Sequence, residues 1–130
     1  MYVLDTNTLI YFFKGIGNVG KNLLASSPKE IAIPAIVLFE LEYGIAKSTS
    51  PEKRRAQLST LCNSVNILPF SQKETGIAAD LRFELERAGT SIGPYDILIA
   101  ATTLSHNGTL VSNNTKEFKR ISKLQLINWL

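Results

Sequence analysis

Short apolar runs alternate along the chain with longer stretches that carry helical signals. The runs are rich in β-branched and aromatic residues, which is typical of strands: Tyr2–Leu4, Ile31–Ile33, Val65–Leu68, Thr109–Ser112 and Leu124–Asn128. Strands that alternate with helices favour βαβ units, and such units build a parallel sheet with helices on both faces. The pattern therefore predicts an α/β fold.

Helix signals mark the stretches between the apolar runs. Thr6 or Asn7 is expected to cap the first helix, and Pro34, Pro51 and Pro94 stand where helices begin, a position that tolerates proline. The expected helices are Leu9–Lys14, Val19–Ser26, Pro34–Lys47, Pro51–Asn63, Gln72–Ala88 and Tyr95–His106.

The segment Ala35–Ala46 is apolar except for two carboxylates, Glu40 and Glu42. We expect such a helix to be buried nearly all round. A carboxylate among apolar neighbours is costly unless it is paired or binds a metal, so a functional role for one of the two is indicated. The alternatives are an ion pair with an arginine of another helix, or exposure of one edge. The neighbouring residues do not distinguish Glu40 from Glu42.

The composition is that of one folded domain covering residues 1–130, with 45% hydrophobic and 19% charged residues, which excludes a disordered chain. Cys62 is the only cysteine, so an internal disulfide is excluded and a reducing compartment is suitable. The run Tyr2–Leu4 is too short for a signal peptide or a membrane span. We therefore expect a cytoplasmic protein.

The formal net charge of +3 permits a polyanionic partner without identifying one. The basic residues are scattered, so no single run indicates a nucleic-acid-binding arm. Candidate contacts to an RNA backbone are Arg82, Arg87, Lys119 and Arg120, for each of which a solvated helix surface is the simpler interpretation.

Asp5 directly follows the first predicted strand. In open parallel sheets, ligands bind beyond the carboxyl ends of the strands, near the point where the strand order reverses. Asp5, Thr6 and Asn7 would bring a carboxylate, a hydroxyl and an amide there, and oxygen groups of this kind bind Mg²⁺ or Mn²⁺. The alternative is that Asp5 only caps the following helix.

Two further polar groups occupy comparable positions. Asp96 lies in the first turn of an apolar helix, where the helix dipole favours an acid whatever the function. Polar residues also follow the fourth strand, although a capped turn would explain them equally well: Ser112, Asn113, Asn114 and Glu117. If the sheet is parallel, these groups converge with Asp5, and the gathered acids need a neutralising cation.

Several other chemistries are excluded or disfavoured. The chain has no Gly-Lys-Ser/Thr phosphate loop and no Gly-x-Gly-x-x-Gly motif, and one cysteine and one histidine cannot provide a zinc site. His106 is expected near a helix end, and no Gly-x-Ser-x-Gly motif accompanies it, which disfavours a Ser-His-Asp triad.

Four motifs together resemble the PIN-domain ribonuclease toxins of the VapC type, from VapBC toxin–antitoxin modules. They occur in the family's order and span nearly the whole chain: Leu4-Asp-Thr-Asn7, Phe39-Glu-Leu-Glu-Tyr-Gly44, Ile92-Gly-Pro-Tyr-Asp-Ile-Leu-Ile-Ala-Ala101 and Leu110-Val-Ser-Asn-Asn-Thr-Lys-Glu-Phe118. The resemblance implies a five-stranded parallel sheet flanked by helices and a homodimer. It also implies a VapB-like antitoxin whose C-terminal segment would block the acidic pocket.

The same resemblance assigns roles to individual residues. Asp5, Glu40 and Asp96 match the family's metal-binding acids, which selects Glu40 over Glu42. Many relatives have aspartate in the last motif, where this chain has Asn114 and Glu117; we assign Glu117 as the fourth carboxylate and keep Asn114 as the alternative. Tyr95 also departs from the family, which often has Asn or a smaller polar residue there, and this departure would affect substrate contacts.

The resulting hypothesis is an endoribonuclease that uses Mg²⁺, or Mn²⁺, to activate a water for attack on an RNA phosphodiester, with tRNA as the preferred substrate. The metal ligands and catalytic groups are Asp5, Glu40, Asp96 and Glu117, and the substrate-binding candidates are Thr6, Asn7, Ser112 and Asn114. One alternative is an inactive PIN-fold module that binds RNA or the antitoxin. Another is a phosphotransfer domain with Asp5 as nucleophile, which Asn7 disfavours because the second aspartate is missing.

Overall fold

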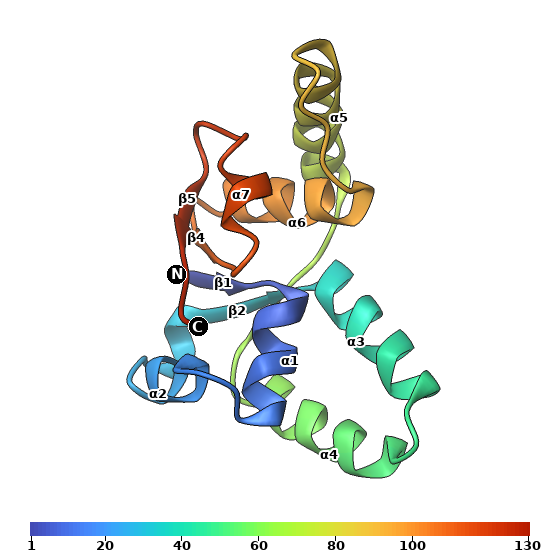
Figure 1. Ribbon diagram of the computed structural model, residues 1–130, viewed down its shortest axis with the longest axis vertical. Helices are drawn as coiled ribbons and strands as arrows, with labels where there is room; N and C mark the ends of the chain where they lie inside the picture. Colours follow the sequence, from blue (N-terminus) through green and yellow to red (C-terminus); the bar gives the residue numbers. More distant parts are fainter.

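A single five-stranded parallel sheet forms the centre of the computed structural model, which describes all 130 residues (Figure 1). The strands are β1 (Tyr2–Leu4), β2 (Ile31–Pro34), β3 (Asn66–Leu68), β4 (Thr109–Val111) and β5 (Gln125–Ile127). Their order is β3-β2-β1-β4-β5, and all neighbouring pairs are parallel. The predicted α/β class and all five predicted strands are confirmed, with strand ends shifted by one residue or so.

The chain reverses its direction across the sheet between β1 and β4. It runs outward from β1 to β2 and β3, then returns through two helices to place β4 on the other side of β1. Tyr2, Val3 and Leu4 pair in register with Thr109, Leu110 and Val111. The residues that follow β1 and β4 therefore emerge side by side at the carboxyl edge, at the point where open α/β sheets bind ligands.

Seven α-helices and one 3₁₀ helix connect and flank the strands: α1 (Thr6–Lys14), α2 (Val19–Leu24), η1 (Pro28–Glu30), α3 (Ala35–Lys47), α4 (Pro51–Cys62), α5 (Gln72–Arg87), α6 (Pro94–Ser105) and α7 (Thr115–Phe118). In Figure 1, β1 and β2 lead directly into α1 and α3, α4 lies at the lower end, and α5 projects from the upper end. No helix is both long and apolar enough to cross a bilayer.

The hydrophobic core is one cluster of 27 buried apolar residues. Its centre is formed by the three inner strands, where Val3, Leu4, Ile33, Leu110 and Val111 are completely buried. Inner strands covered by helices on both faces need apolar side chains on both sides, which explains the continuous apolar runs. The edge strands β3 and β5 instead expose most of their residues.

One face of α3 lies open to solvent. Val37, Leu41 and Ile45 are buried at a spacing of four residues, whereas Phe39 and Tyr43 are 53% and 58% exposed. The expectation that this helix is buried nearly all round is therefore wrong. Its second apolar face lies outside the core, where Phe39 contacts the exposed ring of Tyr95 in α6. Apolar content alone does not distinguish a core face from an exposed one.

The cap of α1 also differs from the expectation. The helix begins at Thr6, and Asp5 is its N-cap, with Oδ1 accepting a hydrogen bond of 2.9 Å from the backbone N–H of Thr8. The expected cap at Thr6 or Asn7 is wrong by one or two residues. The helix starts as soon as β1 ends, which leaves no connecting turn between them.

A buried carboxylate joins α5 to α6. The spacing of Ile77, Leu81 and Leu85 predicts the buried stripe of α5; Leu81 and Leu85 are buried, while Ile77 is only half-buried. Glu74 is also buried, at 2% exposure. It accepts hydrogen bonds from the backbone and side chain of Ser71, in a capping box, and from the Ser105 hydroxyl of α6.

These hydrogen bonds make the stability of the α5–α6 contact depend on pH. They lower the pKa of Glu74 to about 2, with the Ser105 hydroxyl as the largest cause and Ser71 next. A carboxyl whose pKa is lower in the folded than in the unfolded chain stabilises the fold above its ordinary pKa. That contribution is lost as the pH falls from the ordinary value of 4.5 towards 2.

Glu74→Gln should lower the free energy of unfolding at pH 7 by about 1–3 kcal/mol, because it removes a charged acceptor from buried donors. The difference from the wild type should shrink as the pH falls through the range from 4.5 to about 2. Urea unfolding of the wild type and the variant, at pH 7 and in acid, measures the difference in the free energy of unfolding at each pH. Glu84→Gln, an exposed position on the same helix, is the control and should change neither. If Glu74→Gln lowered the free energy of unfolding equally at pH 7 and in acid, Glu74 would not be the source of this pH dependence.

Candidate functional site

Asp5 and Ser112 meet at the point where the strand order reverses. The backbone N–H of Asp5 donates to the carbonyl of Val111 at 3.2 Å, which extends the pairing of β1 with β4 by one residue. The Ser112 hydroxyl donates to Asp5 Oδ2, while Oδ1 caps α1. Both residues are buried, and burial raises the pKa of Asp5 against the lowering effect of the bonds from Ser112 and Thr8. The helix-cap interpretation and the predicted position in the crevice are therefore both correct.

Glu40 reaches the same edge from α3. It is half-buried, and its Oε1 accepts a hydrogen bond of 2.7 Å from the hydroxyl of Thr6 in the first turn of α1. Glu42 is exposed on another side of α3, where its charge contributes to the raised pKa of the half-buried Cys62 thiol, after the larger effect of burial. The structure thus separates two glutamates that their sequence neighbours do not distinguish.

Asp96 lies in the first turn of α6, facing the other acids. Its pKa is raised to about 6, first by burial and then by the negative charges of Asp5, Glu117 and Glu40, in that order. The ordinary value is 3.8, so the protein strongly disfavours a fourth negative charge at this position. The three acids that perturb Asp96 are the ones that the sequence groups with it.

Glu117 and Asn114 lie together beyond β4. The Asn114 backbone N–H donates to Ser112 Oγ at 2.9 Å, and its side-chain amide donates to Glu117 Oε2 at 3.3 Å. Hydrogen bonds therefore lead from Asp5 through Ser112 and Asn114 to Glu117. The structure brings both candidates for the fourth position into the site, with Asn114 supporting Glu117.

Two other polar residues of the motifs point elsewhere. Asn7 is exposed and its side chain makes no hydrogen bond, so it takes no part in this network. Asn113 is exposed as well, and its side-chain oxygen accepts a bond from Asn128 beyond β5.

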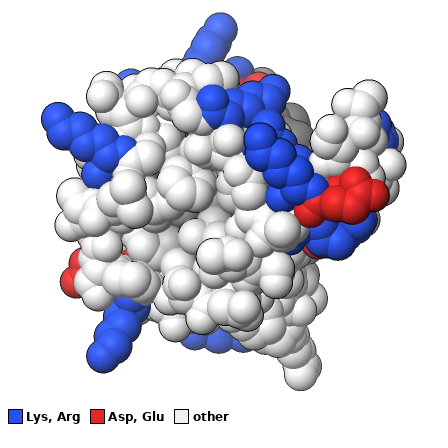
Figure 2. Space-filling view, turned by 90° about the horizontal axis from the view of Figure 1, so that it is seen from below, with Lys and Arg blue, Asp and Glu red and all other residues white.

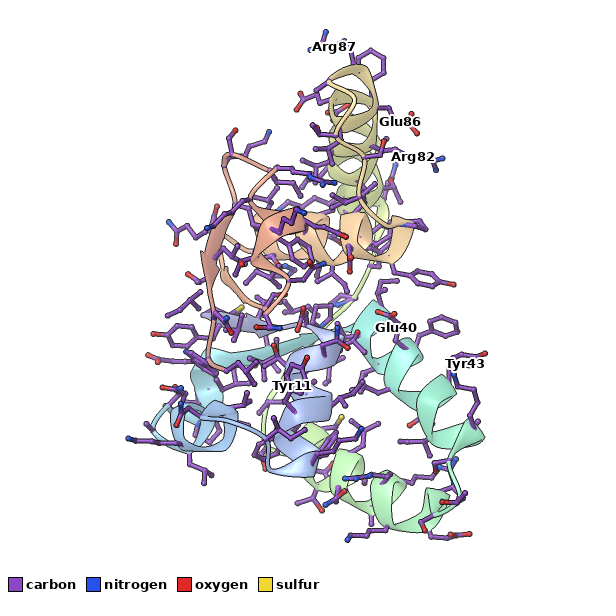
Figure 3. All side chains as sticks on the ribbon, in the orientation of Figure 1. Tyr11, Glu40, Tyr43, Arg82, Glu86 and Arg87 are labelled. Carbon is purple, nitrogen blue, oxygen red and sulfur yellow. The ribbon has the colours of Figure 1, made fainter.

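No cationic side chain neutralises the acidic cluster, by which we mean Asp5, Glu40, Asp96 and Glu117. The only ion pair in the structure joins Arg82 to Glu86 within α5, at 3.2 Å. Figure 3 shows Arg82 and Arg87 high on α5, away from Glu40, and Arg120 donates to the carbonyl of Ser91. The alternative of an ion pair between a glutamate of α3 and an arginine is therefore excluded, and Arg82 and Arg87 do not border the site.

The donor set of the acidic cluster suits a hard divalent cation. It offers carboxylates, the hydroxyls of Thr6 and Ser112 and the amide of Asn114, which are the oxygen ligands that Mg²⁺ and Mn²⁺ bind. No three acidic side chains are already arranged as ligands of one ion, because Asp5 and Glu40 direct oxygens to hydroxyl donors instead. The residues fit such an ion in the chemistry of their oxygen donors.

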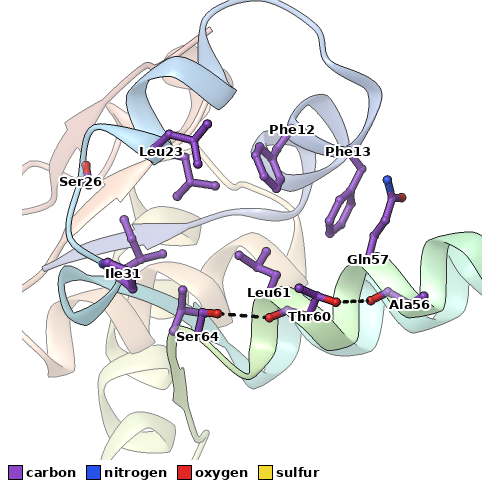
Figure 4. Close-up of a pocket in the computed structure, with 13 residues that line it drawn as sticks. Phe12, Phe13, Leu23, Ser26, Ile31, Ala56, Gln57, Thr60, Leu61 and Ser64 are labelled. Carbon is purple, nitrogen blue, oxygen red and sulfur yellow. Dashed lines mark hydrogen bonds between the residues drawn. The ribbon is translucent and has the colours of Figure 1, made fainter.

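Two hollows lie beside α1 and α4, and only the smaller one includes a residue of the acidic cluster. The larger, of about 650 Å³, lies between α1, α2 and α4; aromatic and aliphatic side chains such as Phe12, Leu23 and Leu61 line it, without any charged residue (Figure 4). The smaller, of about 280 Å³, lies between α1, α3 and α4 and includes Glu40 together with Lys14 and Arg54. Sequence reasoning missed both cations as site residues, since neither belongs to a motif.

Comparison with known proteins places the chain in a family. A family model described as PIN domain matches residues 2–124. The chain is 44% identical to Ribonuclease VapC2 of Rickettsia felis over 131 aligned positions, which cover 99% of this chain and 98% of the relative. It is 32% identical to the tRNA(fMet)-specific endonuclease VapC of Salmonella typhimurium, covering 98% of this chain and 97% of the relative.

Solved structures agree with these relatives. VapBC2 from Rickettsia felis, bound to a DNA fragment from its promoter, superimposes with a TM-score of 0.91 at 43% identity, over 99% of this chain and 98% of that one. DNA-bound VapBC from Salmonella typhimurium gives 0.92 at 32% identity, with the same coverage of both chains. The chain therefore belongs to the VapC family of PIN-domain ribonucleases.

Proposed function

We propose that this protein is a Mg²⁺-dependent endoribonuclease and the toxin of a type II toxin–antitoxin pair. The observation that carries the proposal is the acidic cluster itself. Four carboxylates share the carboxyl edge of the sheet without a cationic side chain, and three of them raise the pKa of the fourth. A site that maintains such repulsion is expected to bind a metal cation, and Mn²⁺ would fit the same ligands.

Asp5, Glu40, Asp96 and Glu117 would hold the ion or ions. When bound, Mg²⁺ lowers the pKa of a water and offsets the charge that develops on the scissile phosphate. The protein's own contribution is positioning: Ser112 and the start of α1 fix Asp5, Thr6 fixes Glu40, and Asn114 fixes Glu117. Thr6, Ser112 and Asn114 also offer polar groups to the substrate phosphate, whereas exposed Asn7 would contact RNA only from the rim.

We propose tRNA as the substrate class. Its support is the pair of relatives from Salmonella typhimurium and Shigella flexneri, both named tRNA(fMet)-specific endonucleases, which are 32% and 30% identical to this chain over 98% of its length. Incubation with total RNA and mapping of the new ends tests this proposal. Cleavage confined to ribosomal or messenger RNA would contradict it.

A VapB-like antitoxin is the proposed protein partner. The structures with the same fold include VapBC complexes from Rickettsia felis and Salmonella typhimurium. The uncharged hollow between α1, α2 and α4 in Figure 4 is a surface of the size and apolar character that a partner's amphipathic helix would cover. From there, an extended segment would pass the smaller hollow to reach the acidic cluster.

The inactive-module alternative is less well supported, because every carboxylate that the metal chemistry requires is present and unpaired with a cation. The phosphotransfer alternative is weaker still. Both carboxylate oxygens of Asp5 accept hydrogen bonds, which reduces its nucleophilicity, and Asn7 is not part of the site.

Asp96→Asn should abolish RNA cleavage, because it removes one negative ligand with little change in shape. It should also leave the melting temperature unchanged or raise it, since Asp96 is a charge that the folded protein disfavours. A gel assay with purified RNA and Mg²⁺, together with a thermal scan, measures both effects. Glu42→Gln, at an exposed position of α3, is the matched control and should keep full activity. Cleavage by Asp96→Asn would refute the assignment of the site.

Mg²⁺ should stabilise the wild-type protein, because binding to the folded state alone shifts unfolding by mass action. Removing the ion with EDTA should stop cleavage and return the melting temperature to its metal-free value. The gain in melting temperature should be much smaller in Asp96→Asn. A gain of equal size in both proteins would place the ion elsewhere.

We also propose a homodimer formed through the exposed aromatic face of α3 and its neighbours. Phe39 and Tyr43 of α3 and Tyr95 of α6 are each between 47% and 58% exposed, and Phe39 contacts Tyr95 with ring centroids 5.8 Å apart. Figure 3 shows the Tyr43 ring pointing away from the body of the protein. Such a patch is typical of an interaction surface.

Tyr43→Arg should convert the dimer to a monomer, because it inserts a second cation beside Lys47, which lies 4.4 Å from the Tyr43 ring. Light scattering coupled to size-exclusion chromatography measures the mass. Leu24→Arg, at an 82% exposed leucine of α2, adds the same charge elsewhere and should leave the dimer intact. A wild-type protein that is monomeric, or a dimer that Tyr43→Arg does not affect, would exclude this interface.

A further inference from the structure

The smaller hollow begins at the acidic cluster and extends away from it. It lies between α1, α3 and α4, and Glu40, whose carboxylate accepts from Thr6, is the member of the acidic cluster that lines it. The volume of about 280 Å³ is near the lower end of small-ligand pockets, which start at about 300 Å³. The hollow therefore has room for about one monomer of a polymeric ligand that also reaches the acidic cluster.

Two cations line this hollow, and neither is paired with a carboxylate. Arg54 is half-buried, and its Nη1 donates to the carbonyl of Phe13 and to the side chain of Gln57, both at 3.0 Å. These bonds fix the guanidinium while Nε and Nη2 keep their N–H groups free. Lys14, in the last turn of α1, is exposed and makes no hydrogen bond or ion pair. The hollow thus contains two groups that can bind an anion: the guanidinium of Arg54, which is held by hydrogen bonds, and the ammonium of Lys14, which is not.

The remaining lining is apolar except for Ser48, whose hydroxyl donates to the carbonyl of Ile45. Ile10 and Phe13 contribute from α1, and Leu41 and Ile45 from α3, with Gly44 between them. Gly44 has no side chain, and a Cβ added there would meet nothing within 4 Å, so its side of the hollow is open. An apolar wall beside two cations suits a ligand that joins a flat, weakly polar group to an anion, and a nucleotide is such a ligand.

We propose that this hollow is a subsite for one nucleotide of the RNA whose phosphodiester is held at the acidic cluster, with Lys14 and Arg54 binding that nucleotide's phosphate. The inference rests on the proposed ribonuclease function and adds the residues that hold the strand. Cationic side chains that contact backbone phosphates contribute to the affinity for RNA. Lys14 and Arg54 are the cations that share a hollow with Glu40.

Charge distinguishes this hollow from its larger neighbour. The residues lining the hollow of Figure 4 include no charged side chain, as expected for a surface that binds an apolar protein segment. Figure 2, which views the molecule from the α4 end, shows Lys and Arg outnumbering Asp and Glu around an uncharged centre. Lys14 and Arg54 line the smaller hollow and not the larger one, which favours an anionic ligand in the smaller one.

RNA affinity measured without cleavage tests this subsite. In an Asp96→Asn background, fluorescence anisotropy with a short labelled single-stranded oligoribonucleotide of mixed sequence gives the Kd over a series of KCl concentrations. Lys14→Glu should weaken binding by about five- to tenfold, as expected for one lost charge-assisted contact. It should also lower the slope of log Kd against log salt by about 0.7, the value for one single-strand phosphate contact.

Matched variants make the result specific. Lys14→Arg retains the charge and should restore affinity, and Lys14→Gln should give a smaller loss than Lys14→Glu. Arg87→Glu makes the same charge change at the tip of α5, away from Glu40 in Figure 3, and should alter affinity less than twofold. Arg54→Lys keeps a positive charge but loses the planar guanidinium with its several N–H donors, and it should weaken RNA binding. The melting temperature of this variant reports any loss of stability from the missing bond to Phe13.

The outcomes separate the two proposals. Equal RNA affinity for Lys14→Glu and Arg87→Glu overturns the subsite, even if the wild-type protein cleaves RNA through its acids. A loss of affinity for an antitoxin peptide, with RNA affinity unchanged, also overturns it and assigns the cations to the protein partner. Lys14-dependent RNA binding by a wild-type protein that does not cleave supports the subsite and refutes the ribonuclease activity instead.

Discussion

The site depends on the pairing of β1 with β4. These strands are distant in sequence, and because the chain reverses across the sheet between them, Asp5 and Ser112 emerge as neighbours. The bond from Ser112 to Asp5 then fixes one end of a network that continues through Asn114 to Glu117. A different strand order would leave each residue at the end of its own strand, with no common site.

Repulsion among the acids is the cost of this arrangement, and the protein limits it with hydroxyl and amide donors. Ser112 and Thr6 each donate to a carboxylate, and Asn114 donates to a third. Neutral donors reduce the repulsion without occupying the site with a fixed positive charge. An arginine would neutralise the acids more completely, but it would compete with a metal for the same oxygens. The preference for neutral donors is consistent with carboxylates that remain available to an ion.

Periodicity and helix signals were sufficient to predict the strands and most helices, because the inner strands must be apolar on both faces and proline marks three helix starts. They did not predict which face of α3 is buried, since Phe39 and Tyr43 have the apolar character of core residues. They also gave no reason to prefer Glu40 over Glu42. Lys14 and Arg54 belong to no motif and become neighbours of Glu40 only through the packing of α1, α3 and α4. Glu74 resembles an ordinary first-turn acid until Ser105 is seen beside it.

Asp5 both caps α1 and belongs to the acidic cluster, so the acids of the cluster are not equally free to change. Loss of an N-cap side chain costs a protein about 0.5–2 kcal/mol, whereas Asp96 is a charge that the fold disfavours. In a cell that survives by inactivating a ribonuclease of this kind, substitution of Asp96 would leave a folded, abundant protein. The route through Asp5 yields a less stable chain that quality control would remove. Mutations that abolish the toxicity would therefore more often leave a folded, inactive protein than remove the protein from the cell.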